Sequence, residues 1–447
     1  MDSEKVIQDL NQRFAQPLPE FYKRRIIFWC DEEREFEDKL DEIVLRDAKL
    51  IALTGTNYFA VKKLLGVEDP TGNYVVYCPL SYEKPEDDWL LDIRLYSEEY
   101  RADLISNWMD EMGLPQTAAL RKQVKEYRKF FKAAVRREKI AKQKNIPSVP
   151  RQLDMAVMGA LAGIVDVTPY AIIKKVLCAG LDTGTNSMYC GFADYGIDKA
   201  FWNMVQKGTG YVADIPNLGH LAAHILLTSA TRTMQPEYLS KWKDFVSEAH
   251  QAYCYDFVSE WLHSTDADQL REIVIRIEEE LKLSEQFMKL DVADLVNTET
   301  FPCIHELILI KLMTEIADSI IDVNIIRETV EKRRTCVWYE EVKDFYEGIL
   351  QVANMQDFFK EHTTGFHSAQ AVKVWKEYTT EYYKMDTYYR LFHRSYGRSL
   401  KTYHAKLHDL FSHVMEKAEG LYKNWFLGQL GENWSKVCAE EMERYGK

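Results

Sequence analysis

The stretch Arg25-Ile26-Ile27-Phe28-Trp29 decides the fold at the start of this chain. Two similar runs follow at a spacing of about 24 residues, Lys-Leu-Ile-Ala-Leu at 49–53 and Asn-Tyr-Val-Val-Tyr-Cys at 73–78. Short, nearly continuous apolar runs are typical of strands that are covered on both faces, as in a parallel sheet. The sequence therefore predicts three parallel strands near its beginning.

The segments between and after these runs have apolar residues at helical spacing. Residues 33–45 and 58–67 are predicted as helices that connect the strands, and residues 89–100 and 102–112 as two further helices. Strands and helices in this order favour right-handed crossovers within one sheet. We therefore expect residues 1–115 to form a small α/β domain with three layers and a parallel sheet.

Residues 116–150 are expected to hold a basic helix, over 116–145, and a linker. Between Arg121 and Arg151 there are twelve Lys or Arg and two Glu, so the local charge is +10. Because the whole chain carries −13, the remaining residues carry −23. A basic helix within an acidic protein is a candidate for contact with the phosphates of nucleic acid.

The basic helix offers two interpretations. In the first, its cations follow a phosphate backbone while Tyr127, Phe130 and Phe131 stack on bases. In the second, the aromatic residues pack against the protein and the cations form a solvated face. The candidate nucleic-acid-binding residues are Arg121, Lys122, Lys125, Arg128, Lys129, Lys132, Arg136, Arg137 and Lys139.

Beyond the two prolines at 147 and 150 the strand pattern disappears. We expect a large, mostly α-helical region, with a helical domain over 151–335 and a bundle of long helices over 336–447. Aromatic residues at intervals of three and four, from Trp375 to Tyr396, predict helices that pack on helices. A Gly-, Asp- and Tyr-rich segment before Tyr211 is predicted as loops.

Two turns at the ends of predicted strands are candidates for phosphate chemistry. Asp31 and Glu33 follow the first strand, and the turn that follows the second strand consists of Thr54, Gly55, Thr56 and Asn57. Parallel sheets place ligands at the carboxyl ends of their strands, and backbone N–H groups at a helix start can bind phosphate. The residues of both turns favour the ordinary interpretation, a helix start for the first and a tight β–α connection for the second.

The sequence shows none of the common catalytic motifs. It has no G-x-S-x-G or Walker sequence, and the pair His220 and His224 has Leu221 where a zinc protease carries its glutamate. No catalytic residue, metal site or cofactor is therefore predicted for this chain. The eight cysteines are scattered, and no run of 18 apolar residues occurs. This predicts a cytoplasmic protein without a membrane span.

Several short motifs follow one another in order along residues 1–140. They are Lys23-Arg24-Arg25-Ile26-Ile27-Phe28-Trp29, Asp31-Glu32, Glu35-Phe36-Glu37, Thr54-Gly55-Thr56-Asn57-Tyr58-Phe59-Ala60, Val67-Glu68-Asp69-Pro70, Tyr77-Cys78-Pro79, and the runs 85–93 and 95–100. In this order the motifs resemble the start of the type A PglZ family of type 1 BREX phage-defence systems. Residues 151–447 are compatible with the middle section of that family.

The resemblance implies a function in antiviral defence. The PglZ family belongs to the alkaline-phosphatase superfamily and acts beside a methyltransferase and ATPases. Its hydrolase domain, with a divalent metal such as zinc, follows the region that resembles this sequence, so the resemblance assigns no catalytic residue here. The chain is thus expected to be a scaffold that positions a catalytic domain and docks BREX proteins and DNA, without being an enzyme by itself.

Two alternatives to this function remain at the level of the sequence. In one, the α/β domain has its own nucleotide or phosphoryl site at Asp31, Glu33 and the turn 54–57. In the other, the chain is a purely structural helical adaptor.

Overall fold

The computed structural model describes residues 3–80, 82 and 84–445, and the chain divides into two compact units. Unit 1 takes the residues up to 172 together with 188–201, and unit 2 takes 173–187 and 202–447. The finer division into four parts stays a prediction.

Unit 1 begins with a four-stranded sheet in the order β2-β3-β1-β4. The strands are β1 (Ile26–Cys30), β2 (Lys49–Ala52), β3 (Tyr74–Cys78) and β4 (Glu98–Tyr100). Every pairing is parallel, and β1 and β3 run in register from Ile26 opposite Tyr74 to Cys30 opposite Cys78. The predicted α/β fold with a parallel sheet is confirmed.

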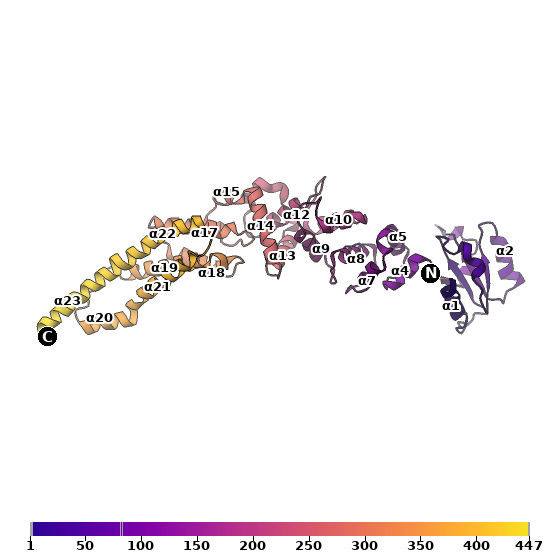
Figure 1. Ribbon diagram of the computed structural model, residues 1–447, viewed down its shortest axis with the longest axis horizontal. Coiled ribbons are helices and arrows are strands. Elements are labelled where there is room, and N and C mark those ends of the chain that lie inside the picture. The colour runs from indigo at the N-terminus through magenta and orange to yellow at the C-terminus, as the bar shows by residue number, and fades with distance from the viewer. Residues whose placement is uncertain (1–2, 81, 83, 446–447) are drawn as a thin grey trace. The chain divides into compact units, whose positions relative to one another are not determined.

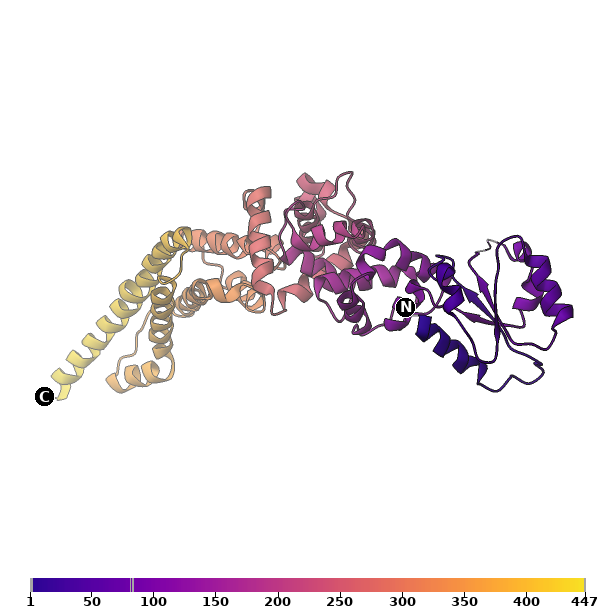
Figure 2. The ribbon, with the colours of Figure 1, turned by 45° about the vertical axis from the view of Figure 1, so that its right-hand side comes forward.

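Both faces of the two central strands, β1 and β3, are buried, which explains their continuous apolar runs, whereas the edge strand β2 is only partly buried. On one face the side chains of Ile27, Trp29, Val75 and Tyr77 share a core with helix α1 (Ser3–Phe14). On the other face Phe28 and Val76 share a core with α2 (Tyr58–Lys63) and its continuation η2 (Leu64–Glu68). Figures 1 and 2 show α1 and α2 on opposite sides of the sheet. These are the expected three layers.

Two of the connections differ from the prediction. Residues 33–45 form only one short 3-10 helix, η1 (Glu37–Glu42), because Arg34 adopts a left-handed backbone (φ 55°) that turns the chain before a helix can start. Residues 89–100 contain the single turn α3 (Leu91–Arg94), preceded by η3 (Pro85–Asp87), and then strand β4. A strand of three residues is too short to show a period of two.

The predicted basic helix over 116–145 is wrong as a single helix. The segment forms α5 (Ala118–Glu126), α6 (Arg128–Phe131) and α7 (Ala134–Ala141). Tyr127 and Ala133 interrupt the helices, Ala133 with an extended backbone (φ −89°, ψ 120°). These breaks turn Phe130 and Phe131 inward, where both are fully buried. Burial of two aromatic rings thus outweighs the helical periodicity of the sequence.

The remaining helices of unit 1 lie around this segment. They are α4 (Leu104–Glu111), α8 (Pro150–Ala162) and α10 (Ser187–Asp194). Helices α9 (Pro169–Cys178) and α11 (Asp198–Thr209) cross the points where the chain passes between the units. The segment before Tyr211, predicted as loops, therefore contains α10 and α11. Their hydrophobic residues, such as Phe192 and Phe201, are buried despite the turn-forming residues around them.

Every regular element among the described residues of unit 2 is a helix, as predicted. Its first helices are α12 (Leu218–Ala230), η4 (Pro236–Phe245), η5 (Glu248–His250), α13 (Gln251–Leu262), α14 (Ala267–Leu281), α15 (Leu283–Phe287), α16 (Val292–Leu295), α17 (Cys303–Ala317) and α18 (Val323–Arg333). The later ones are α19 (Tyr339–Glu361), α20 (Ala371–Glu377), η6 (Tyr378–Tyr382), α21 (Tyr383–Ser399), α22 (Ala405–Glu419), η7 (Gly420–Leu427) and α23 (Gly428–Tyr445).

The last elements form two long helices with π turns inside them. η6 joins α20 to α21, and η7 joins α22 to α23. Helix α19 packs along α21 and α22, and the rings of Phe345 and Phe392 lie 5.1 and 5.5 Å from that of Phe411. Phe392 and Tyr396 of the predicted aromatic series therefore pack on a neighbouring helix, whereas Trp375 at the start of the series is exposed.

The described part of the chain contains no helix that is long and apolar enough to cross a membrane.

Candidate functional site

Asp31 lies at the carboxyl end of β1, where the sequence placed a candidate phosphate site. Its side chain is fully buried and accepts hydrogen bonds from the backbone N–H groups of Glu35 (3.1 Å) and Phe36 (2.9 Å). The hydroxyl of Tyr77 donates a third hydrogen bond to it, at 2.7 Å. These donors hold the turn after β1 in place, so the carboxylate acts as a structural cap rather than as an exposed ligand.

Glu33 and its neighbour Glu32 face the basic segment instead of a ligand. The ammonium of Lys125 lies 2.9 Å from a carboxylate oxygen of Glu33 and 3.4 Å from one of Glu32, which also pairs with Arg101 at 3.3 Å. The hydrogen bond from Lys125 lowers the pKa of Glu33. The two acids of this turn are thus occupied by cations of the protein itself.

The turn Thr54–Asn57 satisfies its own polar groups. The side-chain oxygen of Asn57 accepts from the backbone N–H of Thr54 (3.0 Å), and its amide donates to the carbonyl of Ala52 (2.8 Å). Gly55 has a φ of +82°, which favours glycine at this position. The helix that follows, α2, has only six residues. The geometry is that of a tight β–α turn.

Two cations of the basic segment are buried structural residues. Arg121 pairs with Asp103 at 2.6 Å, and Arg137 pairs with Glu111 at 2.6 Å and lies over the ring of Trp108. Loss of Arg121 would leave the buried Asp103 carboxylate uncompensated. Arg137 pairs with a half-exposed acid, but its buried side chain also donates to the carbonyl of Phe131 and packs on Trp108, so both arginines stabilise unit 1. They are not available for an external phosphate.

Three further candidates are partly engaged by the protein. Lys139 donates to the carbonyl of Ala160 at 3.3 Å, and Lys129 donates to that of Asp194 at 2.9 Å. The guanidinium of Arg136 lies 4.5 Å from the ring centre of Tyr195. A cation over an aromatic ring keeps its charge, and Lys129 is exposed and Arg136 half-buried, so both still contribute positive potential.

The remaining candidates, Lys122, Arg128 and Lys132, are exposed and have no side-chain hydrogen bond or ion pair within the described residues. Arg128 and Lys132 lie one helical turn apart, since the backbone N–H of Lys132 donates to the carbonyl of Arg128. We define the basic surface as Arg128, Lys129, Lys132 and Arg136. It leaves out Arg121, Lys125 and Arg137, which the tertiary structure pairs with carboxylates, and also Lys139 and the exposed Lys122 on α5.

The aromatic residues of the segment do not belong to this surface. Phe130 and Phe131 are fully buried, and the hydroxyl of the half-buried Tyr127 donates to Asp154 at 2.6 Å. The expected base stacking by the two phenylalanines is therefore sterically excluded in this structure.

Sequence reasoning overlooked a second group of cations, on α21 and in the residues that follow it up to the start of α22, although the sequence shows it. No Asp or Glu occurs between Asp386 and Asp409, while five Lys or Arg do: Arg390, Arg394, Arg398, Lys401 and Lys406.

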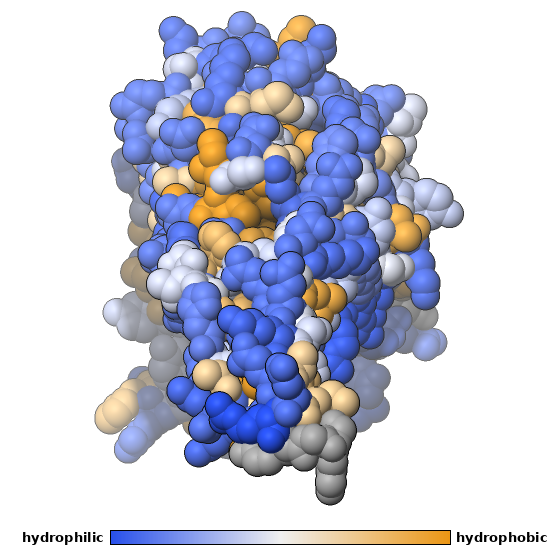
Figure 3. Space-filling view, turned by 90° about the vertical axis from the view of Figure 1, so that its left-hand side faces the viewer, coloured by the Kyte–Doolittle hydropathy of each residue, from blue (hydrophilic) through white to orange (hydrophobic). Residues whose placement is uncertain are grey.

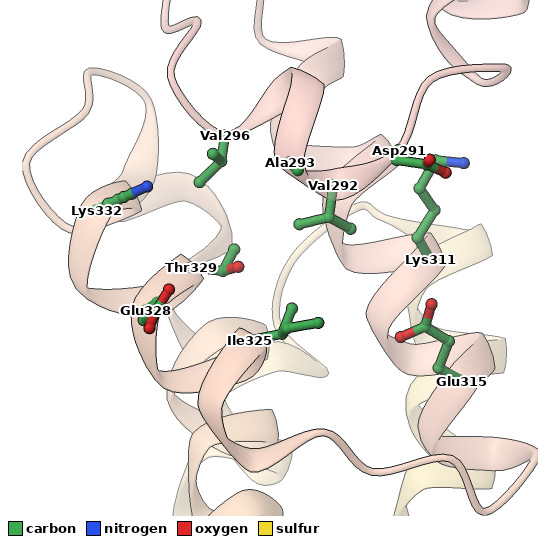
Figure 4. Close-up of a pocket in the computed structure, with 10 residues that line it drawn as sticks. All are labelled: Asp291, Val292, Ala293, Val296, Lys311, Glu315, Ile325, Glu328, Thr329 and Lys332. Carbon is green, nitrogen blue, oxygen red and sulfur yellow. The ribbon is translucent and has the colours of Figure 1, made fainter.

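A hollow of about 410 Å³ lies between α16, α17 and α18 in unit 2. Figure 4 shows the apolar side chains Val292, Val296 and Ile325 on its walls, with Lys311, Glu315, Glu328 and Lys332 around them. The charges are of both signs. The lining residues contain no nucleophile beside a base, so this hollow offers no catalytic arrangement.

A smaller cavity of about 270 Å³ is lined by residues of α14, α17 and α19 and by His404. His404 lies 3.1 Å from Glu306, and Arg271 pairs with Glu341 at 2.6 Å. Glu278 accepts from the backbone N–H of Cys303, and burial raises the pKa of its carboxyl to about 7. Across the residues that the structure describes, no three His, Cys, Asp or Glu side chains are placed to hold a metal ion.

Two curated proteins match the chain along its length. It is 27% identical over 447 residues to the alkaline phosphatase-like protein PglZ of Bacillus cereus (strain H3081.97), which covers 100% of this chain and 51% of that protein. It is 25% identical over 463 residues to the alkaline phosphatase-like protein BrxZ of Escherichia coli O9:H4 (strain HS), covering 96% of this chain and 51% of that protein. No family model and no solved structure matches.

These matches confirm the resemblance to PglZ proteins and extend it from the first 140 residues to the whole chain. The chain spans about half the length of the curated relatives it matches.

Proposed function

We propose that this chain is the assembly part of a BREX-type PglZ protein, and that its basic surface binds the phosphate backbone of nucleic acid. In this proposal it positions an alkaline phosphatase-like catalytic domain, with a divalent metal, and docks other BREX proteins. The observation that carries the nucleic-acid contact is the set of exposed cations at and directly after α6, namely Arg128, Lys129 and Lys132. The side chains of Arg128 and Lys132 have no hydrogen bond or ion pair among the described residues.

The chemistry of the basic surface favours phosphates over bases. Its four side chains are cations, and the phenylalanines between them face the core. Contacts of this kind depend on released counterions and are independent of base sequence.

Exchanging Arg128 and Lys132 for glutamate should weaken binding of a DNA duplex about tenfold at moderate salt. The slope of log K against log salt should also fall by about 1.8, because each lost phosphate contact contributes about 0.9. Fluorescence anisotropy of a labelled duplex titrated with the chain at several salt concentrations measures both quantities.

The control is the double variant Lys23→Glu and Lys39→Glu. It changes the net charge equally at two exposed lysines of unit 1 that have no side-chain partner within the described residues. An equal loss in both variants would mean that only net charge matters. Wild-type binding by the Arg128→Glu/Lys132→Glu variant would favour the structural adaptor instead.

A further inference from the structure

Helix α21 and the turn that follows it carry an uninterrupted series of cations. Arg390, Arg394 and Arg398 are spaced four residues apart, so they lie on successive turns of one helical face. Lys401 follows one turn later, in the turn after the helix. All four are exposed. We call them the α21 stripe.

The stripe lies away from the packed face of the helix. The buried residues of α21 are Met385, Phe392, Ser395 and Ser399. At 100° per residue, the mean direction of these four is about 145° from that of the stripe. The three arginines of the stripe therefore lie outside the buried side of α21.

The protein does not neutralise the stripe. None of its four cations has an ion pair within 4.0 Å among the described residues, and the hydrogen bonds of Arg390 go to the carbonyl of Asp386 and the hydroxyl of Thr387. One acid lies near enough to respond: burial raises the pKa of Asp344 on α19, and Arg398 and Arg394 oppose that rise. Only Arg394 and Arg398 of the four cations act on this half-buried acid, so the stripe keeps a net positive charge.

An exposed aromatic residue stands at the end of the stripe. Tyr403, in the turn between α21 and α22, is fully exposed, and Leu400 beside it is 58% exposed. Within the described residues the ring of Tyr403 makes no aromatic contact and its hydroxyl no hydrogen bond, so the ring is open to a ligand. This is the reverse of the basic surface of unit 1, where the phenylalanines are buried.

We propose that the α21 stripe and Tyr403 form a second nucleic-acid site, which takes a single strand. The guanidinium groups bind successive phosphates, and an unpaired base stacks on the ring of Tyr403. A duplex offers no free base face to the tyrosine, so the exposed ring favours a single strand. The site uses other residues than the basic surface and does not depend on it.

The face in Figure 3, seen from the side on which α23 ends, is mainly hydrophilic with limited hydrophobic areas. An acidic protein or an anionic membrane would also be attracted to cations. A membrane would also use the exposed Tyr403 and Leu400, so vesicle binding is kept as a separate outcome of the test. We take the single strand as the ligand because arginines at one-turn spacing beside a fully exposed ring offer both phosphate contacts and base stacking.

The test is binding of a labelled oligothymidylate of about 20 nucleotides to the full chain by fluorescence anisotropy. The triple variant Arg390→Glu, Arg394→Glu and Arg398→Glu should weaken binding at least tenfold and reduce the salt slope by about 2, since each contact with a single strand contributes about 0.7. Tyr403→Ala should weaken binding about tenfold without changing the slope, and Tyr403→Phe should restore it.

The matched control reverses three exposed lysines elsewhere in unit 2, Lys175, Lys207 and Lys360. The unfolding midpoint of each variant is measured as well and should equal that of the wild type, which shows that the variant is folded. A triple variant with the wild-type slope, or a Tyr403→Ala variant with wild-type affinity, would overturn the site. The site would also be overturned if the triple variant lost binding to anionic vesicles or polyglutamate but bound oligothymidylate as the wild type does.

The two sites can fail separately. If only the Arg128→Glu/Lys132→Glu variant loses nucleic acid, the stripe is not a contact and the proposed function stands. If only the stripe variants lose it, the proposed contact in unit 1 is wrong and the inference stands.

Discussion

Replacing Glu278 by glutamine should raise the free energy of unfolding by about 3 kcal/mol at pH 8 and leave it nearly unchanged at pH 4. Burial raises the pKa of this carboxyl from 4.5 to about 7. In the unfolded chain the group ionises near pH 4.5, whereas the folded chain keeps its proton until about pH 7. Between these values the unfolded state binds fewer protons, so stability falls as the pH rises.

The size of the effect follows from the pKa difference. Each unit corresponds to about 1.4 kcal/mol, and 2.5 units give about 3 kcal/mol once both states are ionised. Glutamine carries no charge at any pH and keeps the oxygen that accepts from the Cys303 N–H. Urea unfolding followed by circular dichroism at pH 4, 6 and 8 measures the difference.

The neighbouring Glu279 supplies the control, because its side chain is exposed. Glu279→Gln should change stability by less than about 0.5 kcal/mol at each pH. If Glu278→Gln shifts the midpoint equally at pH 4 and pH 8, the carboxyl is not a buried acid with a raised pKa.

Replacing Gly348 by alanine should lower the free energy of unfolding by about 2 kcal/mol. Gly348 lies in α19 against α22, where an added Cβ would be 2.9 Å from Cε2 of Phe411 and nearer still to Cζ. That ring is fully buried and is held by Phe345, Phe392 and Tyr396. Overpacking at such a site costs about 3 kcal/mol, which exceeds the gain of about 1 kcal/mol from alanine in a helix.

Gly397 in α21 provides the matched comparison, since nothing lies within 4 Å of its added Cβ. Gly397→Ala should raise stability by up to about 1 kcal/mol. Urea unfolding of both variants tests the packing of α19 on α22. A Gly348→Ala variant as stable as the Gly397→Ala variant would contradict it.

The sequence could predict the central strands of the sheet because a strand that is buried on both faces needs an apolar residue at every position. Ile26–Cys30 and Tyr74–Cys78 are buried at each position and read as continuous apolar runs. Strand β4 has no such run, as only Tyr100 of its three residues is buried. Its position beside β1 depends on pairing with residues about seventy positions away.

For residues 116–145 the prediction from the sequence was wrong in another way, because it gave one helix where the structure has three. Local periodicity favoured one long helix, and the breaks at Tyr127 and Ala133 are set by which side chains find a core. Helix propensities differ by tenths of a kcal/mol, whereas a buried phenylalanine contributes about 2 kcal/mol or more.

By itself, the sequence determined the α/β domain, the helical region, the likeness to PglZ proteins and the position of the excess positive charge. It also contained the α21 stripe, because the faces of one helix follow from spacing alone. Only the tertiary structure decided which cations are free: Arg121 and Arg137 find carboxylates from α4 and its N-cap, while Arg128 and Lys132 find none within the described residues. The reason is that charge is a property of a residue, whereas its neutralisation depends on distant residues brought within a few ångströms by folding.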